Sequence, residues 1–166
     1  MTLGPVLHSF GYGLDFLREQ VADVASADMA AQPNGILNHP AWVIGHLAQV
    51  CQDVGGVIGV PPWLADGWAG RYGGGSAPVA DVGAYAAKDD ALAVLGDARS
   101  RITRAVGRLD ESRLDEPFPD ESLRDVFPSV RHFLTQVLVG HTAYHVGQVG
   151  AWRRAMRLPP VARGFE

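Results

Sequence analysis

Two histidines stand four residues apart in the stretch GHTAYHVGQV, residues 140–149. On an α-helix, this spacing leaves the side chains of His141 and His145 about 40° apart around the axis, close enough to chelate one metal ion. Both residues fall within an apolar stripe of a predicted helix, which indicates that the imidazoles face the core. The pair could therefore supply two of the three protein ligands of a metal site.

The third ligand has to come from another helix, because a catalytic zinc-type site commonly takes three protein ligands and keeps one position open. His46, in WVIGHLAQV, is the other histidine inside an apolar helical stripe. Neighbouring helices of a bundle can present inward side chains to one point. We therefore predict a site formed by His46, His141 and His145 with an open fourth place. Imidazoles alone do not choose among zinc, nickel, copper and iron.

An alternative interpretation makes these residues ordinary core histidines, because an HxxxH pair on a helix is often fortuitous. Three inward histidines without nearby carboxylates are, however, costly to bury unless they share a ligand. His132 precedes His141 by nine residues, so on an α-helix it points to the opposite side and is excluded. Gln148 stays near the face of His145 and either supports the site through a hydrogen bond or makes a helix–helix contact.

Four long segments with helical periodicity must position these residues. They cover about residues 5–28, 40–57, 82–109 and 129–156. Pro40 suits the first turn of the second segment, with Asn38 or His39 as its N-cap. No strand-like alternation of any length appears. The predicted fold class is all-α, an up-down four-helix bundle in a single domain over residues 1–166.

The connections read as loops. Residues 59–80 contain a short helical turn in WLADGW and a flexible GGGS linker, and residues 110–128 contain one short turn around residues 122–126. Trp63, Trp68 and Tyr72 either rim a pocket or cover the end of the bundle. We expect Asp53 to be solvated and Cys51 to pack in the core. The carboxylate pairs between residues 110 and 121 are expected to cap helices or to be solvated.

Composition narrows the function classes. The net charge of −4 with scattered arginines and a single lysine, Lys88, disfavours a nucleic-acid partner. Cys51 is the only cysteine, which excludes an intramolecular disulfide and Cys-rich metal sites. No signal segment and no apolar run long enough to span a bilayer is apparent, so we expect no membrane association and a cytoplasmic location.

The stretches NHPAWVIGHLAQV and HTAYHVGQV together resemble the DinB/YfiT-like superfamily of metal-binding four-helix bundles. His46 matches the single histidine on the family's second helix, and His141 and His145 match its HxxxH pair. Gly147 and Gln148 match the Gly-Gln that follows the pair. Asn38 and Trp42 match the start of the second helix, whereas the RYGGGSAPV loop departs from better-studied members. The resemblance implies a divalent metal, commonly zinc or nickel, with water in the open position.

The resemblance also implies the kind of activity. It points to thiol S-transferases that use a low-molecular-weight thiol such as bacillithiol or mycothiol, to thiol-dependent isomerases, and to metal-dependent hydrolases. A bound thiolate or water would attack a small-molecule substrate, and no catalytic side chain is assigned. It further implies a homodimer. The alternatives are a non-catalytic, metal-stabilised stress-response bundle or sensor, and a purely structural bundle with core histidines.

Overall fold

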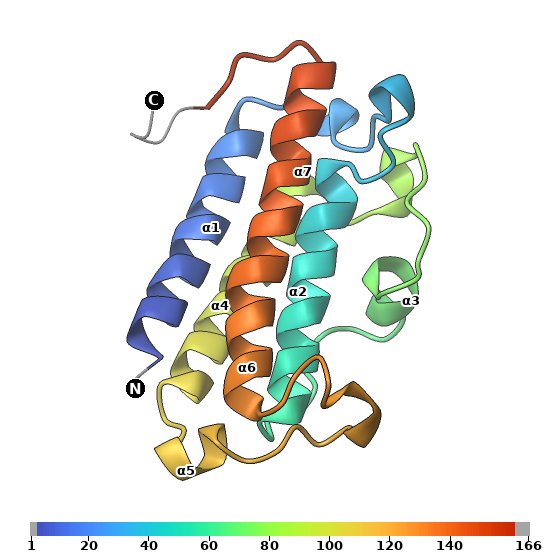
Figure 1. Cartoon of the computed structure of the whole chain (residues 1–166). Coiled ribbons are helices and arrows are strands. Elements are labelled where there is room, and N and C mark those ends of the chain that lie inside the picture. Colours follow the sequence, from blue (N-terminus) through green and yellow to red (C-terminus); the bar gives the residue numbers. More distant parts are fainter. Residues whose placement is uncertain (1–2, 162–166) are drawn as a thin grey trace.

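The computed structural model describes residues 3–161, and within this range it contains helices and no strands. Figure 1 shows the long segments packed side by side: α1 (Gly4–Ala22), α2 (Pro40–Val57), α4 (Lys88–Val106) and a C-terminal helix made of α6 (Val130–Thr135), η5 (Gln136–His141) and α7 (Thr142–Ala155). The connections hold the short helices α3 (Trp68–Tyr72) and α5 (Glu111–Leu114). They also hold the 3₁₀ turns η1 (Ser26–Asp28), η2 (Pro33–Gly35), η3 (Val82–Ala84) and η4 (Glu121–Leu123).

The helices do not alternate in direction. α2 and α4 begin at the same end of the bundle, where the rings of His39 and Tyr85 meet edge to face with centroids 4.9 Å apart. α1 runs the opposite way, because Arg18 donates to Leu92 O near the start of α4. α2 and α4 therefore run parallel to each other and antiparallel to α1 (Figure 1).

α7 runs parallel to α1. Gly13 of α1 lies against Thr142 of α7. Further toward the C-terminal ends of both helices, Gln20 of α1 lies against Gly150 of α7. The resulting order is up-down-down-up, so the predicted alternating up-down order is wrong. The physical reason is the connection of residues 58–87, which is long enough to carry the chain back along the bundle before α4 begins.

Three predicted boundaries also differ. The first helix ends at Ala22, not near residue 28. The third begins at Lys88, not Val82, because Tyr85 is extended and its hydroxyl accepts a hydrogen bond from Val79 N at 2.8 Å. It ends at Val106, not near residue 109. The helix α5 was not expected. The second helix and the ends of the fourth lie within one residue of their predicted positions.

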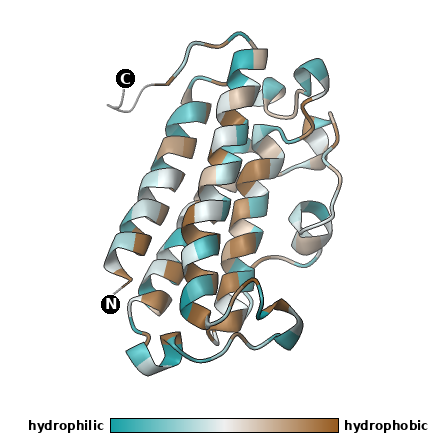
Figure 2. Ribbon diagram, viewed as in Figure 1, coloured by the Kyte–Doolittle hydropathy of each residue, from teal (hydrophilic) through white to brown (hydrophobic). Residues whose placement is uncertain are grey.

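Apolar residues on the inner faces of the long helices form the core. Figure 2 shows apolar and polar residues interleaved along each long helix, as expected for helices with one buried face. The fully buried side chains include Leu17, Val21, Val43, Ile44, Ile102, Leu134 and Trp152. Trp152 also donates from Nε1 to Ala31 O at 2.7 Å, so the largest buried ring has a partner for its polar atom.

The connection of residues 58–87 packs tightly on α2 at Gly45. The ring of Tyr72 is 1% exposed and occupies the space beside this glycine, where a Cβ would come within 2.2 Å of the ring. Trp68 donates from Nε1 to Gly45 O at 3.0 Å. Gly45 therefore lets α3 lie directly against the helix turn that carries His46.

We expect Gly45→Ala to lower the free energy of unfolding by about 1–3 kcal/mol, because the added methyl overlaps the Tyr72 ring. The matched control is Gly56→Ala on the same helix, where the added Cβ would have no side chain and no atom of another segment within 4 Å. That change favours the helix and should leave stability equal or slightly higher. Urea unfolding followed by circular dichroism measures both. Equal stabilities of the two variants would contradict the close packing at Gly45.

Candidate metal centre

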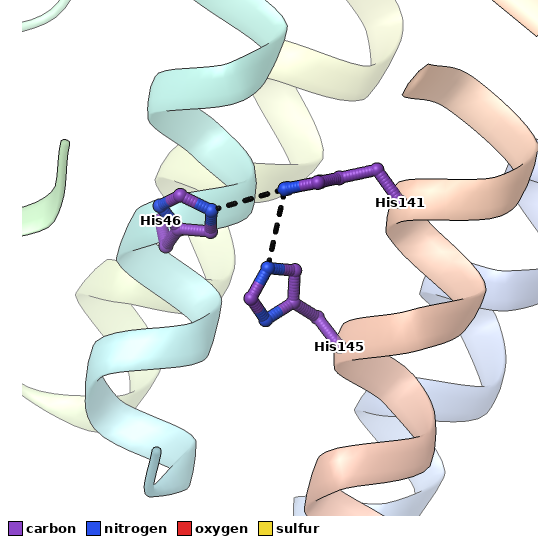
Figure 3. A group of neighbouring side chains, drawn as sticks. All are labelled: His46, His141 and His145. Carbon is purple, nitrogen blue, oxygen red and sulfur yellow. Dashed lines mark hydrogen bonds between the residues drawn. The ribbon is translucent and has the colours of Figure 1, made fainter. Parts of the chain in front are cut away.

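The structure brings the three predicted residues together. His46 extends from α2, and His141 and His145 extend from the C-terminal helix toward it (Figure 3). The Nε2 atom of His141 lies 3.4 Å from that of His46 and 3.2 Å from that of His145. All three candidate ligand atoms lie within 4.8 Å of one another. Their role as metal ligands stays a prediction, but their convergence is a property of the fold.

Hydrogen bonds at the outer ring nitrogens orient two of the imidazoles. His46 donates from Nδ1 to the carbonyl oxygen of Tyr72 at 2.7 Å. His145 donates from Nδ1 to Gln148 Oε1 at 2.8 Å, and the same oxygen accepts from Asn38 Nδ2 at 3.0 Å. Because both acceptors are oxygens, the proton of each neutral ring lies on Nδ1. The lone pairs of the two Nε2 atoms therefore point into the cluster.

His141 lacks such support. Its Nδ1 atom is buried and has no hydrogen-bond partner among the described residues. Its Nε2 faces two Nε2 lone pairs, and a single proton there satisfies one of them at most. A cation that accepts all three lone pairs resolves this conflict. In a tetrahedral site with bonds of about 2.0–2.1 Å, neighbouring ligands lie about 3.3–3.4 Å apart. Two of the three separations, 3.2 and 3.4 Å, fit such an ion, and the third, between His46 and His145, is no more than 4.8 Å.

Burial keeps these imidazoles neutral. His46 is 6% exposed and His145 is 4% exposed. Burial lowers the pKa of His145 to about 4, and the neighbouring rings of His46 and His141 act in the same direction. Burial also lowers the pKa of His46, although the hydrogen bond to Tyr72 O opposes this shift. Neutral imidazole is the form that binds metals, so the site is ready for a cation near neutral pH.

Trp42 closes one side of the cluster. Its ring stacks on His46, with centroids 4.4 Å apart and an interplanar angle of 11°. Its Nε1 donates to Ser76 Oγ at 2.9 Å, and that hydroxyl donates to Gly73 O at 2.8 Å. The GGGS stretch, interpreted from the sequence only as a flexible linker, thus fixes the ring that covers a candidate ligand.

The sequence left either Asn38 or His39 as the N-cap of the second helix, and the structure decides between them. His39 is the cap, because its Nδ1 accepts from Trp42 N at 3.3 Å. Asn38 instead holds Gln148, so the Gln148 interpretation as a support for an imidazole agrees with the geometry. No sequence pattern identifies the Tyr72 carbonyl as a partner of His46, since every residue carries a backbone carbonyl.

The remaining candidates lie outside the cluster. Asp53 accepts from Gln49 Nε2 at 2.7 Å and is exposed. Cys51 is buried, and burial raises the pKa of its thiol to about 12, which makes it unreactive. Trp63 packs under Arg101, whose guanidinium carbon lies 5.6 Å from the ring centroid. Trp68 and Tyr72 cover α2.

His132 is not a member of the cluster, but the prediction that it points to the opposite side of the helix from His141 is wrong. Both residues line one hollow of about 830 Å³. The reason is the π-helical segment η5, which accommodates one extra residue in its turn. Nine residues then rotate the chain as eight would, by about 80° instead of 180°. We call this space the hollow beside His141.

The fold and the cluster define a class of protein: a helical bundle with a candidate three-histidine metal centre between two antiparallel helices. The sequence profile of the DinB superfamily matches residues 14–149, and the chain belongs to this superfamily. No functionally curated protein matches the chain.

A solved structure is similar over nearly the whole chain. The crystal structure of a conserved protein from Enterococcus faecalis superposes with a TM-score of 0.76, covering 93% of this chain and 97% of that one. The two sequences are 15% identical, so the likeness shows a shared fold. Within residues 3–161, no helix is both long and apolar enough to cross a membrane.

Replacing Gln148 should weaken the site without removing a ligand. In Gln148→Leu, the Nδ1 proton of His145 loses its acceptor, and we expect metal affinity to fall about 10- to 100-fold. The matched control is Gln148→Glu, which keeps an oxygen acceptor for the Nδ1 proton of His145 and should retain the affinity. Competition with a chromophoric zinc chelator measures both affinities. If both variants bind zinc equally well, Gln148 does not support His145.

The metal-free protein should lose stability as the pH falls from 6.5 toward 4. The pKa of His145 is lowered from 6.5 to about 4, so in this window the unfolded chain binds more protons there than the folded chain. The contribution of neutral His145 to the free energy of unfolding is therefore fully present above pH 6.5. Below pH 6.5 the free energy of unfolding falls by up to about 1.4 kcal/mol per pH unit. Urea unfolding of chelator-treated protein measures this slope. His145→Gln should flatten it, and an unchanged slope would contradict the assignment.

Proposed function

We propose that this chain is a divalent-metal-dependent enzyme that transfers a low-molecular-weight thiol to a small-molecule electrophile. The observation that carries this proposal is the set of three neutral imidazole nitrogens converging on one point, with no carboxylate among them in the described residues. Three ligands leave room in a four-coordinate site for a substrate atom. Membership of the DinB superfamily supports a metal site in this position.

Thiol transfer suits the site better than hydrolysis. A metal ion can ionise a bound water by itself, and many metal-dependent hydrolases add a carboxylate that takes up or relays its proton. None of the residues that line the hollow beside His141 is an aspartate or glutamate. A thiol ionises near pH 8.5 without help, and its thiolate is a strong ligand for zinc and nickel. When bound, the metal would supply a Lewis acid that favours the thiolate form.

The residues of the chain would orient and shield the reacting groups. His46 and His145 keep their protons on the outer nitrogens, held by Tyr72 O and Gln148. The stacked Trp42 ring excludes water from the His46 side. His141 is half-buried and opens to the hollow, so reactants approach from its side. In the transfer, a sulfur–carbon bond forms, the leaving group departs with its electron pair, and the thiol proton passes to solvent.

The test is conjugation of 1-chloro-2,4-dinitrobenzene to a panel of small thiols by zinc-loaded or nickel-loaded protein. Removing the metal should lower the rate about 100-fold or more, since a metal Lewis acid contributes several kcal/mol. His145→Ala should have the same effect, whereas the control His8→Ala, exposed on α1, should not. Absorbance of the thioether product gives the rate, and metal analysis gives the occupancy.

Other results would favour the other functions. Thiol-independent cleavage of 4-nitrophenyl acetate at the same metal would indicate a hydrolase. Metal that raises the unfolding temperature without either activity would indicate a non-catalytic bundle or sensor. Purified protein that has never met a chelator and carries no metal would contradict the metal site itself.

A further inference from the structure

We propose that the hollow beside His141 binds the organic substrate, and that this substrate is a small molecule with an apolar body and a carboxylate group. The inference deepens the proposed function and rests on it for the identity of the reacting atoms. The position of the hollow, its apolar walls and its hydrogen-bond donors support it.

The position of the hollow suits a reactant. It lies between the C-terminal helix and the connection that precedes it, and its volume of about 830 Å³ falls in the usual range for small-molecule sites. It contains His141, the half-buried member of the cluster, whereas His46 and His145 are buried. A molecule in this space would therefore meet the cluster on its open side.

Its walls are largely apolar. Val126 and Tyr144 are 63% and 64% exposed, more than any other large hydrophobic side chain in residues 3–161, and both line the hollow. Phe127 and Val137 add half-buried apolar surface. The Tyr144 ring also meets His145 edge to face, with centroids 5.2 Å apart. Exposed apolar surface gathered beside a candidate metal centre marks a binding site.

Its polar lining offers hydrogen-bond donors. Arg131 and His132 line the hollow, and no carboxylate is among the lining residues. The Arg131 guanidinium is ion-paired with Asp115, whose Oδ1 lies 2.9 Å from Nε, so Asp115 balances much of its charge while orienting it. The Nδ1 atom of His132 lies 2.8 Å from Ser129 Oγ, which fixes the ring. We assign to His132 the tautomer in which the Ser129 hydroxyl donates to Nδ1, so that Nε2 carries the proton and can donate to an anionic oxygen.

The π-helical segment combines these features. It rotates His132 to the same side as His141, which an α-helix would not do. Gly140, next to His141, adds no side chain to the wall, and a Cβ there would meet the Gln136 amide at 3.0 Å. The segment therefore leaves space beside His141 and places the anion donor at the other end of that space.

The experiment is an NMR titration of zinc-loaded protein with 4-phenylbutyrate and with 4-phenyl-1-butanol, its neutral counterpart. Amide shifts should concentrate at residues 126–144, and the carboxylate should bind about three- to tenfold more tightly than the alcohol. His132→Gln should remove this preference, and the matched control His8→Gln should keep it. Tyr144→Ala should weaken both probes alike, because it removes apolar contact. The titration is repeated on chelator-treated protein, so that carboxylate bound to zinc alone does not produce the preference.

The outcomes separate the two proposals. Shifts at residues 126–144 in a protein without conjugation activity would support this inference and overturn the proposed function. Conjugation activity with no shifts there would overturn this inference alone. Equal affinity of the two probes, or a preference that survives His132→Gln, would overturn the assignment of the carboxylate. Circular dichroism of each variant shows that it is folded, and these side chains are exposed, so their loss should not unfold the chain.

Discussion

The antiparallel packing of α2 against the C-terminal helix is the constraint on which the candidate centre depends. It brings His46 within 3.4 Å of His141, 95 residues later in the chain. A shift of one residue along α2 would rotate His46 by about 100° and break the cluster. A second contact fixes the same register, because Asn38 Nδ2 donates to Gln148 Oε1 at 3.0 Å. Packing of two helices, not the chemistry of the ligands, therefore assembles the site.

The parallel arrangement of α2 and α4 has a consequence for that site. Two parallel helices need a long connection between them, and residues 58–87 supply it. The connection returns along α2 and supports three of its residues: Tyr72 O accepts from His46, Ser76 Oγ accepts from Trp42, and Val79 O accepts from His39. The departure from an alternating bundle thus provides the outer hydrogen bond of one candidate ligand, His46, and fixes the Trp42 ring that stacks on it. Gly45 is the position where this close approach is sterically required.

The sequence was sufficient where the signal is local. The apolar stripes of α2 and the C-terminal helix identify His46, His141 and His145, because helical periodicity alone decides which side chains face inward. The directions of the helices were not predictable in this way, since they depend on how the connection of residues 58–87 packs. The π-helical turn was also missed, because apolar residues three and four apart on either side of the turn are read as one regular α-helix, and nothing local in the sequence indicates the extra residue. That omission alone misplaced His132.

The three histidines are unequal, and under the proposed function the inequality favours one side of the candidate centre for the entry of reactants. His46 and His145 are buried and held at Nδ1 by fixed acceptors. His141 is half-buried, lies at the end of the π-helical segment, and has no Nδ1 partner among the described residues. π-turns are rare and frequently occur at functional sites. A centre with two rigid ligands on the buried side and one less constrained ligand at the hollow can change its open coordination position without disturbing the core. This arrangement fits a site where reactants enter beside His141 better than a purely structural ion.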